Sequence, residues 1–327
     1  MGPTLVTGAT GFLGWHIGRL LRERGFEVRA LSRKGEAIEG LDCEVVTGDL
    51  RDRVTIERAV AGCRYVFHAA ADYRLWVRNQ ADEQDMYASN VEGTRELLTA
   101  AKEAGVERVV YTSTVGCIGF PEHGPGDETK PVTLGEMTGP YKRTKFLAEE
   151  VAVAAARELD VTIVNPTTPV GEHDVKPTPS GKIILDFLAG KMPAYVDTGL
   201  NLVDVRDCAV GHLLALERGR RGERYILGSE NLHLREILER LARITGRPAP
   251  RWRIPHFVAY AAGAASTGWA AITGVEPEVS LDAVRMARQK MYASSDKARR
   301  ELGYAPQPVN EALVRAVEWF RVQGMAA

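Results

Sequence analysis

A glycine-rich turn near the start of the chain places the strongest constraint on its fold. Gly8, Gly11 and Gly14, in TGATGFLG, follow an apolar run at residues 4–7 and open a helical pattern that closes at Gly25. Such a turn lets the backbone bend tightly, approach a pyrophosphate closely and pack a helix on a strand, while free N–H groups favour the anion. A purely structural turn is the alternative. The predicted dinucleotide-binding loop also includes Thr10, Phe12 and Leu13.

Short β-branched runs then alternate with longer helical patterns. Strands are predicted in the segments TLVT (4–7), EVRALS (27–32), CEVVTGDL (43–50), RYVFHAAA (64–71), ERVVYTST (107–114) and VTIVNPTT (161–168). Helices are expected around 54–61, 83–104 and 140–159. This alternation is typical of an α/β protein with a Rossmann-type, doubly wound parallel sheet.

The chain changes character after its first half. Residues 1–170 form the predicted dinucleotide-binding domain, and residues 171–327 form a smaller, interleaved C-terminal substrate domain. Segments near 203–229 are expected to return to the sheet, because RYILGS (224–229) resembles a late strand. Residues 233–246 and 310–324 have the periodicity of amphipathic helices.

The ends of the second and third predicted strands bear on the choice of dinucleotide. An acidic residue after the second strand would bind the ribose hydroxyls of NAD, but this chain has Ser32, Arg33 and Lys34 there. A hydroxyl and two cations favour the 2′-phosphate of NADP; the alternative is a solvated Arg33 with NAD bound. Asp49 and Leu50 are expected to contact the adenine, unless Asp49 is only a helix cap.

A tyrosine and a lysine lie one turn apart on a predicted helix. Tyr141 and Lys145, in YKRTK, are four residues apart and therefore neighbours on the helix surface. A nearby ammonium is expected to lower the pKa of the phenol, which could then exchange a proton with a substrate oxygen. Ser113 and Thr114 end the preceding strand and could contact that oxygen, or they could simply terminate the strand.

Together these motifs resemble the extended short-chain dehydrogenase/reductase family. TGATGFLG, GDL, HAAA (68–71), NVEGT (90–94), YTST (111–114), YKRTK, NPTTPVG and DKARRELGY carry the resemblance along essentially the whole chain. It implies that Tyr141 is the catalytic acid/base, that Lys145 activates it and binds the cofactor ribose, and that Thr114 polarises the substrate oxygen with Ser113 beside it. It also implies further cofactor and bracing residues, namely Ala69, Ala70, Ala71, Asn90, Pro166, Thr167 and Thr168.

Two subgroups compete for the substrate. The chain resembles hopanoid-associated sugar epimerases, and it also resembles dihydroflavonol 4-reductase and the 3β-hydroxysteroid dehydrogenase group. Members that use nucleotide sugars usually carry arginines where this chain has Leu200 and Asn165. We therefore expect an NADP(H)-dependent oxidoreductase acting on a secondary alcohol or ketone, with Tyr73 and Trp76 in an apolar wall. Sugar epimerisation and a catalytically silent dinucleotide-binding protein are the alternatives.

Charge and composition limit the expected partners. With 42 basic and 43 acidic residues, the chain has no footprint for nucleic acid, and its four cysteines show no zinc or disulfide spacing. The first residues lack a secretory signal, so a cytoplasmic protein is expected.

Family resemblance implies a homodimer formed through helices near 90–105 and 140–158. The uncharged segment 254–275 predicts a buried or pocket-covering helix, with peripheral membrane contact or a membrane span as alternatives.

Overall fold

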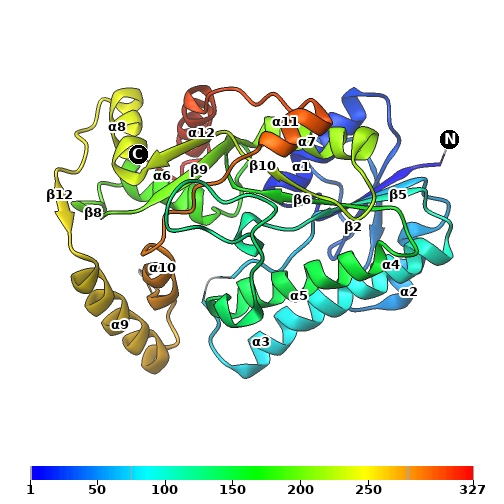
Figure 1. Cartoon of the computed structure of the whole chain (residues 1–327), viewed down its shortest axis with the longest axis horizontal. Helices are drawn as coiled ribbons and strands as arrows, with labels where there is room; N and C mark the ends of the chain where they lie inside the picture. Colours follow the sequence, from blue (N-terminus) through cyan, green and yellow to red (C-terminus); the bar gives the residue numbers. More distant parts are fainter. Residues whose placement is uncertain (1, 75, 278–279, 327) are drawn as a thin grey trace.

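A seven-stranded, entirely parallel sheet forms the centre of the protein (Figure 1). The computed structural model describes residues 2–74, 76–277 and 280–326. The strands of this sheet are β1 (Thr4–Thr7), β2 (Val28–Ser32), β3 (Glu44–Thr47), β4 (Tyr65–His68), β5 (Arg108–Thr112), β6 (Val161–Pro166) and β10 (Arg224–Leu227). Their order is β10-β6-β5-β4-β1-β2-β3, which is the predicted Rossmann-type arrangement.

Helices cover both faces of this sheet, which is why most of its strands are apolar throughout. One face packs on α2 (Arg53–Val60), α4 (Gly93–Glu103) and α5 (Gly139–Ala155). The opposite face packs on α1 (Phe12–Glu23), α7 (Val205–Arg218) and α11 (Asp296–Leu302). Each face therefore has its own hydrophobic core.

The direction in which the chain adds strands reverses at β1. This strand pairs with β2 on one side and with β4 on the other. In open parallel sheets, ligands bind at the carboxyl ends of the strands where such a reversal occurs. The residues at this position are Thr7 on β1 and His68 on β4.

A smaller unit lies beside the sheet and has a separate core. It contains β7 (Thr168–Val170), β9 (Gly199–Asp204), β11 (Glu230–His233), α6 (Pro179–Leu188), α8 (Leu234–Thr245) and α12 (Asn310–Val322). A two-stranded pair, β8 (Ala194–Val196) with β12 (Trp252–Ile254), extends it at the left of Figure 1. The strand expected near 224–229 is confirmed, because β10 pairs with β6 in the large sheet. The smaller unit is therefore interleaved with the sheet.

The uncharged segment forms α9 (His256–Thr273), which pairs with the short α10 (Leu281–Met286). The prediction of a buried helix is wrong, because only Ala259, Gly263 and Ala270 of α9 are buried. That the helix covers a pocket stays a prediction. The small side chains of alanine and glycine pack closely on one side and leave the larger apolar residues outside. Within the described residues, the structure contains no helix long and apolar enough to span a bilayer.

The helical segment expected over 83–104 is divided into three parts. Helix α3 (Gln80–Tyr87) runs into a five-residue π-helical segment (Ala88–Glu92), and α4 follows directly. A π-helical segment inserts an extra residue into the helical repeat and occurs frequently at functional sites. Periodicity alone predicts a continuous helix here and does not reveal the insertion.

Candidate active site

The glycine loop leaves no room for side chains where β1 meets α1. Gly8 has a φ of 77°, and a Cβ atom there would lie 2.7 Å from the backbone nitrogen of Ala70. A Cβ atom on Gly14 would lie 2.1 Å from the carbonyl oxygen of Gly8. The Gly11 amide donates a hydrogen bond of 2.8 Å to that same carbonyl. The loop is thus drawn tightly between β1, α1 and the end of β4.

The start of α1 has the donors that a pyrophosphate requires. Its N-cap residue is Gly11, which offers no side chain to the first amides of the helix. The N–H groups of Phe12 and Leu13 are at the positive end of the helix dipole, where an anion is stabilised. These residues fit the pyrophosphate of a dinucleotide, which they would hold through backbone amides.

The residues expected at the adenine end lie at the ends of β2 and β3. Ser32 is buried at the end of β2, whereas Arg33 and Lys34 are exposed and make no ion pair among the described residues. Hydrogen bonds from Arg51, reinforced by its charge, lower the pKa of Asp49, and the charge of Arg33 acts in the same direction. The positive charge of Arg33 therefore favours the ionised carboxylate of Asp49.

Arg51 is a residue that the sequence interpretation missed. Its Nη2 atom lies 2.9 Å from Oδ2 of Asp49, and its backbone amide donates to Oδ1 at 2.9 Å. Arg51 therefore binds both carboxylate oxygens of Asp49. The position of Arg51 directly after the GDL motif is the sequence feature that could have indicated this contact. Leu50 is buried against Gly93 of α4.

A buried hydrogen-bond chain supports the end of β4. His68 is hydrogen-bonded to the hydroxyls of Thr7 at 2.7 Å and Thr94 at 2.9 Å. Burial, with a smaller effect from the charge of Lys145, lowers the pKa of His68 to about 3, so the ring is neutral. The chain of bonds fixes the backbone that leads to the predicted cofactor residues Ala69, Ala70 and Ala71.

Asn90 lies in the π-helical segment and joins two parts of the site. Its Oδ1 atom accepts a hydrogen bond of 2.7 Å from the amide of Asp72. Its Nδ2 atom donates to the carbonyl of Asp72 and to the hydroxyl of Thr144 on α5, both at 3.1 Å. Asn90 therefore ties the loop after β4 to the helix that carries Tyr141 and Lys145.

Lys145 is buried, and its ammonium is bound by residues of strand β5. Its ammonium donates to the carbonyl oxygen of Thr112 at 2.8 Å and to the hydroxyl of Tyr111 at 3.2 Å. Burial lowers the pKa of Lys145 to about 8. Both partners come from the end of β5, and sequence spacing gave no signal for either.

Tyr141 lies on the same helix, and its ring meets that of Tyr73 edge to face with centroids 4.3 Å apart. Burial raises the pKa of Tyr141 well above its ordinary value, and the neighbouring Tyr73 adds to the effect. This direction is opposite to the one expected from the sequence. The physical reason is that burial disfavours the charged phenolate, while the ammonium of Lys145 binds Tyr111 and Thr112.

Ser113 and Thr114 follow β5, with Ser113 buried and Thr114 partly exposed. The Thr114 hydroxyl accepts a hydrogen bond of 3.1 Å from the Gly116 amide, and the Thr114 carbonyl accepts one of 3.0 Å from Nδ2 of Asn165. Nδ2 of Asn165 also donates to the buried Glu149 at 2.7 Å. Asn165 and Glu149 thus position this turn, a function that the sequence interpretation did not assign to them.

Pro166, Thr167 and Thr168 connect β6 to β7. Pro166 ends β6 and is buried, and the Thr167 amide donates to the carbonyl of Leu227 on β10 at 3.1 Å. Thr168 begins β7. These predicted cofactor residues therefore lie where the large sheet joins the smaller unit.

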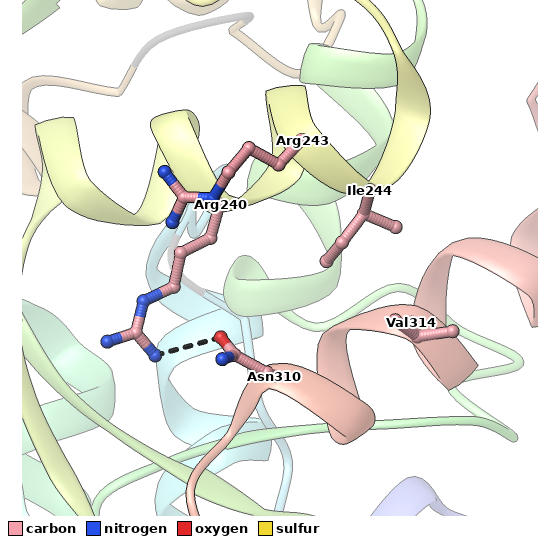
Figure 2. Close-up of a pocket in the computed structure, with 5 residues that line it drawn as sticks. All are labelled: Arg240, Arg243, Ile244, Asn310 and Val314. Carbon is pink, nitrogen blue, oxygen red and sulfur yellow. Dashed lines mark hydrogen bonds between the residues drawn. The ribbon is translucent and has the colours of Figure 1, made fainter.

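A separate pocket lies in the smaller unit, between α8 and α12 (Figure 2). Arg240 donates to Asn310 across it at 3.1 Å and also forms a two-bond ion pair with Glu230. The lining residues are Arg240, Arg243, Ile244, Asn310 and Val314. None of the predicted site residues lines this pocket, so we do not connect it with the candidate active site.

The sheet reversal, the glycine loop and the Tyr–Lys pair on α5 are the features of an NAD(P)-dependent enzyme of the extended short-chain dehydrogenase/reductase type. The family model matches residues 4–228. The chain belongs to the NAD dependent epimerase/dehydratase family.

Three similar proteins illustrate the range of this family. A protein of Synechocystis sp., provisionally named dihydroflavonol 4-reductase, is 45% identical over 98% of this chain and 94% of its own length. Sterol demethylase protein B of Methylococcus capsulatus is 38% identical over 98% of this chain and 99% of its own. The structure of a nucleoside-diphosphate-sugar epimerase from Pseudomonas aeruginosa has a TM-score of 0.82 and 29% identity, covering 100% of this chain and 99% of that one.

The close approach at Gly14 predicts a specific loss of dinucleotide binding. In Gly14→Ala the new methyl group would lie 2.1 Å from the Gly8 carbonyl, so the loop must shift. We expect the Kd for NADPH, measured by fluorescence titration, to rise at least about tenfold. The control is Gly268→Ala, where open space surrounds the new methyl group. Equal Kd values for the two variants would contradict the proposed role of the loop.

Burial of Lys145 predicts a pH-dependent stability. Its pKa is about 8 in the folded protein against an ordinary value of 10.5, so the unfolded chain binds more protons between these values. The free energy of unfolding contributed by this group therefore rises with pH across that window. Urea unfolding at pH 7.5, 8.5 and 9.5 should show wild type gaining stability relative to Lys145→Met. The exposed variant Lys182→Met should parallel wild type, and parallel curves for wild type and Lys145→Met would refute the assignment.

Proposed function

We propose that the protein is an NADP(H)-dependent reductase that interconverts a ketone and a secondary alcohol. The observation that carries this proposal is that two uncharged residues occupy the positions of the usual diphosphate-binding arginines and contact the protein itself. Asn165 and Leu200 stand where nucleotide-sugar enzymes of the extended family usually have arginines. Asn165 is buried and bound to Glu149 and Thr114, and Leu200 packs against the core of the smaller unit. Neither residue supplies a charge for a diphosphate.

Other positive groups between residues 173 and 191 are also engaged or solvated. His173 stacks on Trp15 with ring centroids 3.9 Å apart, and burial lowers its pKa to about 4, so the ring is neutral near pH 7. Lys182 pairs with Asp186 at 3.0 Å. Lys176 and Lys191 are exposed. The contacts of His173 and Lys182 favour an uncharged substrate over a nucleotide sugar.

In the proposed reaction Tyr141 is the proton donor. The phenol is protonated near pH 7, so Oη carries the proton that a ketone oxygen would receive. Burial also raises the pKa and makes this phenol a weaker acid, so the transfer requires a group that stabilises the phenolate. The bound cofactor would supply the hydride. Lys145, one turn further along α5, is held in place to stabilise the phenolate that remains after proton transfer.

The turn after β5 would orient the substrate oxygen. Ser113 and Thr114 present hydroxyls immediately beyond the strand whose last residues bind Lys145. The Asn165–Thr114 hydrogen bond fixes the backbone of this turn. Such a positioned donor stabilises negative charge that develops on oxygen during reduction.

The names of two relatives support an apolar substrate. The Synechocystis protein is provisionally named for a dihydroflavonol, and the Methylococcus capsulatus protein for a sterol. The edge-to-face contact of Tyr73 with Tyr141 places a second aromatic ring beside the proposed proton donor. A ring of this kind suits a flat or terpenoid-like carbonyl compound.

Two other functions remain to be tested against this one. Epimerisation of a nucleotide sugar is favoured by the Pseudomonas aeruginosa neighbour and by the exposed Lys176 and Lys191, which could meet a diphosphate. A silent dinucleotide-binding protein would bind the cofactor without turnover. Retention of both Tyr141 and Lys145 favours an enzyme.

Tyr141→Phe tests the proton donor and the reaction together. Wild type supplied with NADPH and a mixed panel of apolar ketones and nucleotide sugars should oxidise NADPH. Loss of the hydroxyl should lower kcat at least about a thousandfold, with the Kd for NADPH nearly unchanged. Tyr87→Phe, on the partly exposed end of α3, is the control. Sugar interconversion without net NADPH oxidation would establish the epimerase instead, and cofactor binding without any turnover would establish the silent protein.

Arg33→Ala tests the choice of dinucleotide. If Arg33 meets a 2′-phosphate, its removal should raise the Kd for NADPH about 10- to 100-fold while the Kd for NADH changes little. Both constants can be measured by fluorescence titration. Arg24→Ala, an exposed arginine at the end of α1, should leave both values unchanged. Tighter binding of NADH than NADPH by wild type would overturn the NADP assignment.

A further inference from the structure

Helix α9 has its large apolar side chains on the outside of the protein. Phe257 is 74% exposed, Trp269 is 68% exposed and Ile272 is 83% exposed. The helix carries no charged residue along its eighteen positions. A helix that is uncharged all round is normally buried, so an outward face of this composition is unusual in a protein free in water.

The packing of α9 explains which face is left uncovered. A Cβ atom on Gly263 would lie 3.0 Å from Val284 of α10, and the hydroxyl of Thr267 accepts a hydrogen bond of 2.9 Å from the Leu281 amide. At about 100° per residue, the buried Ala259, Gly263 and Ala270 share one narrow face, and Phe257, Trp269 and Ile272 share the opposite one. Figure 1 shows α9 and α10 projecting together from the smaller unit.

Basic residues flank α9 in the sequence. Between residues 247 and 290 the sequence has six basic and three acidic residues, although the whole chain has a net charge of −1. Arg251 and Arg288 are exposed and, in the described chain, make no ion pair. Trp252, 77% exposed, lies between Arg251 and Arg253 just before α9. Aromatic and aliphatic side chains beside cations form a surface suited to an anionic lipid interface.

We propose that α9, together with Trp252, docks the protein on the surface of an anionic membrane. The apolar side chains would enter the boundary between headgroups and acyl chains, while Arg251 and Arg288 would meet lipid phosphates. A second copy of the chain fits this face less well. A two-fold contact through the same patch would bring its basic residues against one another. The helix lies on the membrane in this proposal and does not cross it.

Vesicle flotation with the full chain tests this docking. The protein should float with vesicles of phosphatidylcholine and phosphatidylglycerol, and should float less with pure phosphatidylcholine or at high salt. The triple variant Phe257→Ser, Trp269→Ser, Ile272→Ser should bind the anionic vesicles at least about tenfold more weakly. Because these side chains are exposed, its circular dichroism and NADPH titration should match wild type.

The control carries serine at two exposed valines elsewhere, Val54 and Val322, which are 64% and 81% exposed. It should float as wild type does. Failure of wild type to float, or equal flotation of wild type and the triple variant, would overturn the proposal. So would a wild-type dimer that becomes monomeric in the triple variant without any vesicle binding, because the face would then meet a second copy. None of these readouts depends on the proposed reaction.

Discussion

The approach of three backbone segments at the reversal point of the sheet governs the geometry of the candidate site. The glycine loop after β1, the first turn of α1 and the segment after β4 meet so closely that side chains at Gly8 or Gly14 would displace backbone atoms. This crowding leaves amide groups, rather than side chains, facing the space at the ends of β1 and β4. The hydrogen bond between His68 and Thr7 joins the ends of β1 and β4, and the bond between His68 and Thr94 ties β4 to α4.

The Tyr–Lys pair is organised by the sheet and not by the helix alone. The ammonium of Lys145 is bound to Tyr111 and Thr112 at the end of β5, while Tyr141 lies beside Tyr73. The end of β5 leads directly into the turn at Ser113 and Thr114, and Asn165 on β6 fixes this turn by a hydrogen bond to the Thr114 carbonyl. A change in the register between β5 and β6 would therefore disturb the lysine and the turn at once.

The sequence allowed prediction of the strands of the large sheet, the glycine loop and the helix carrying Tyr141 and Lys145, because each depends on local periodicity or on a turn that only glycine permits. The five strands of the smaller unit were not predicted. It did not reveal the π-helical segment around Asn90 or the pairing of Asp49 with Arg51, since both depend on contacts made after folding. The pKa direction at Tyr141 was missed because helical spacing says nothing of desolvation. The exposed face of α9 was missed because uncharged composition alone does not tell a covered helix from an uncovered one.

The pairing of β10 with β6 has consequences for folding during synthesis and for the behaviour of truncated chains. β10 covers the edge of the large sheet, yet its residues emerge from the ribosome some sixty positions after those of β6. Until then the row of unpaired amides and carbonyls on β6 is open to any extended segment. A fragment ending near residue 170 would keep that edge open to pairing with another chain, so the first 170 residues do not contain the whole of the large sheet.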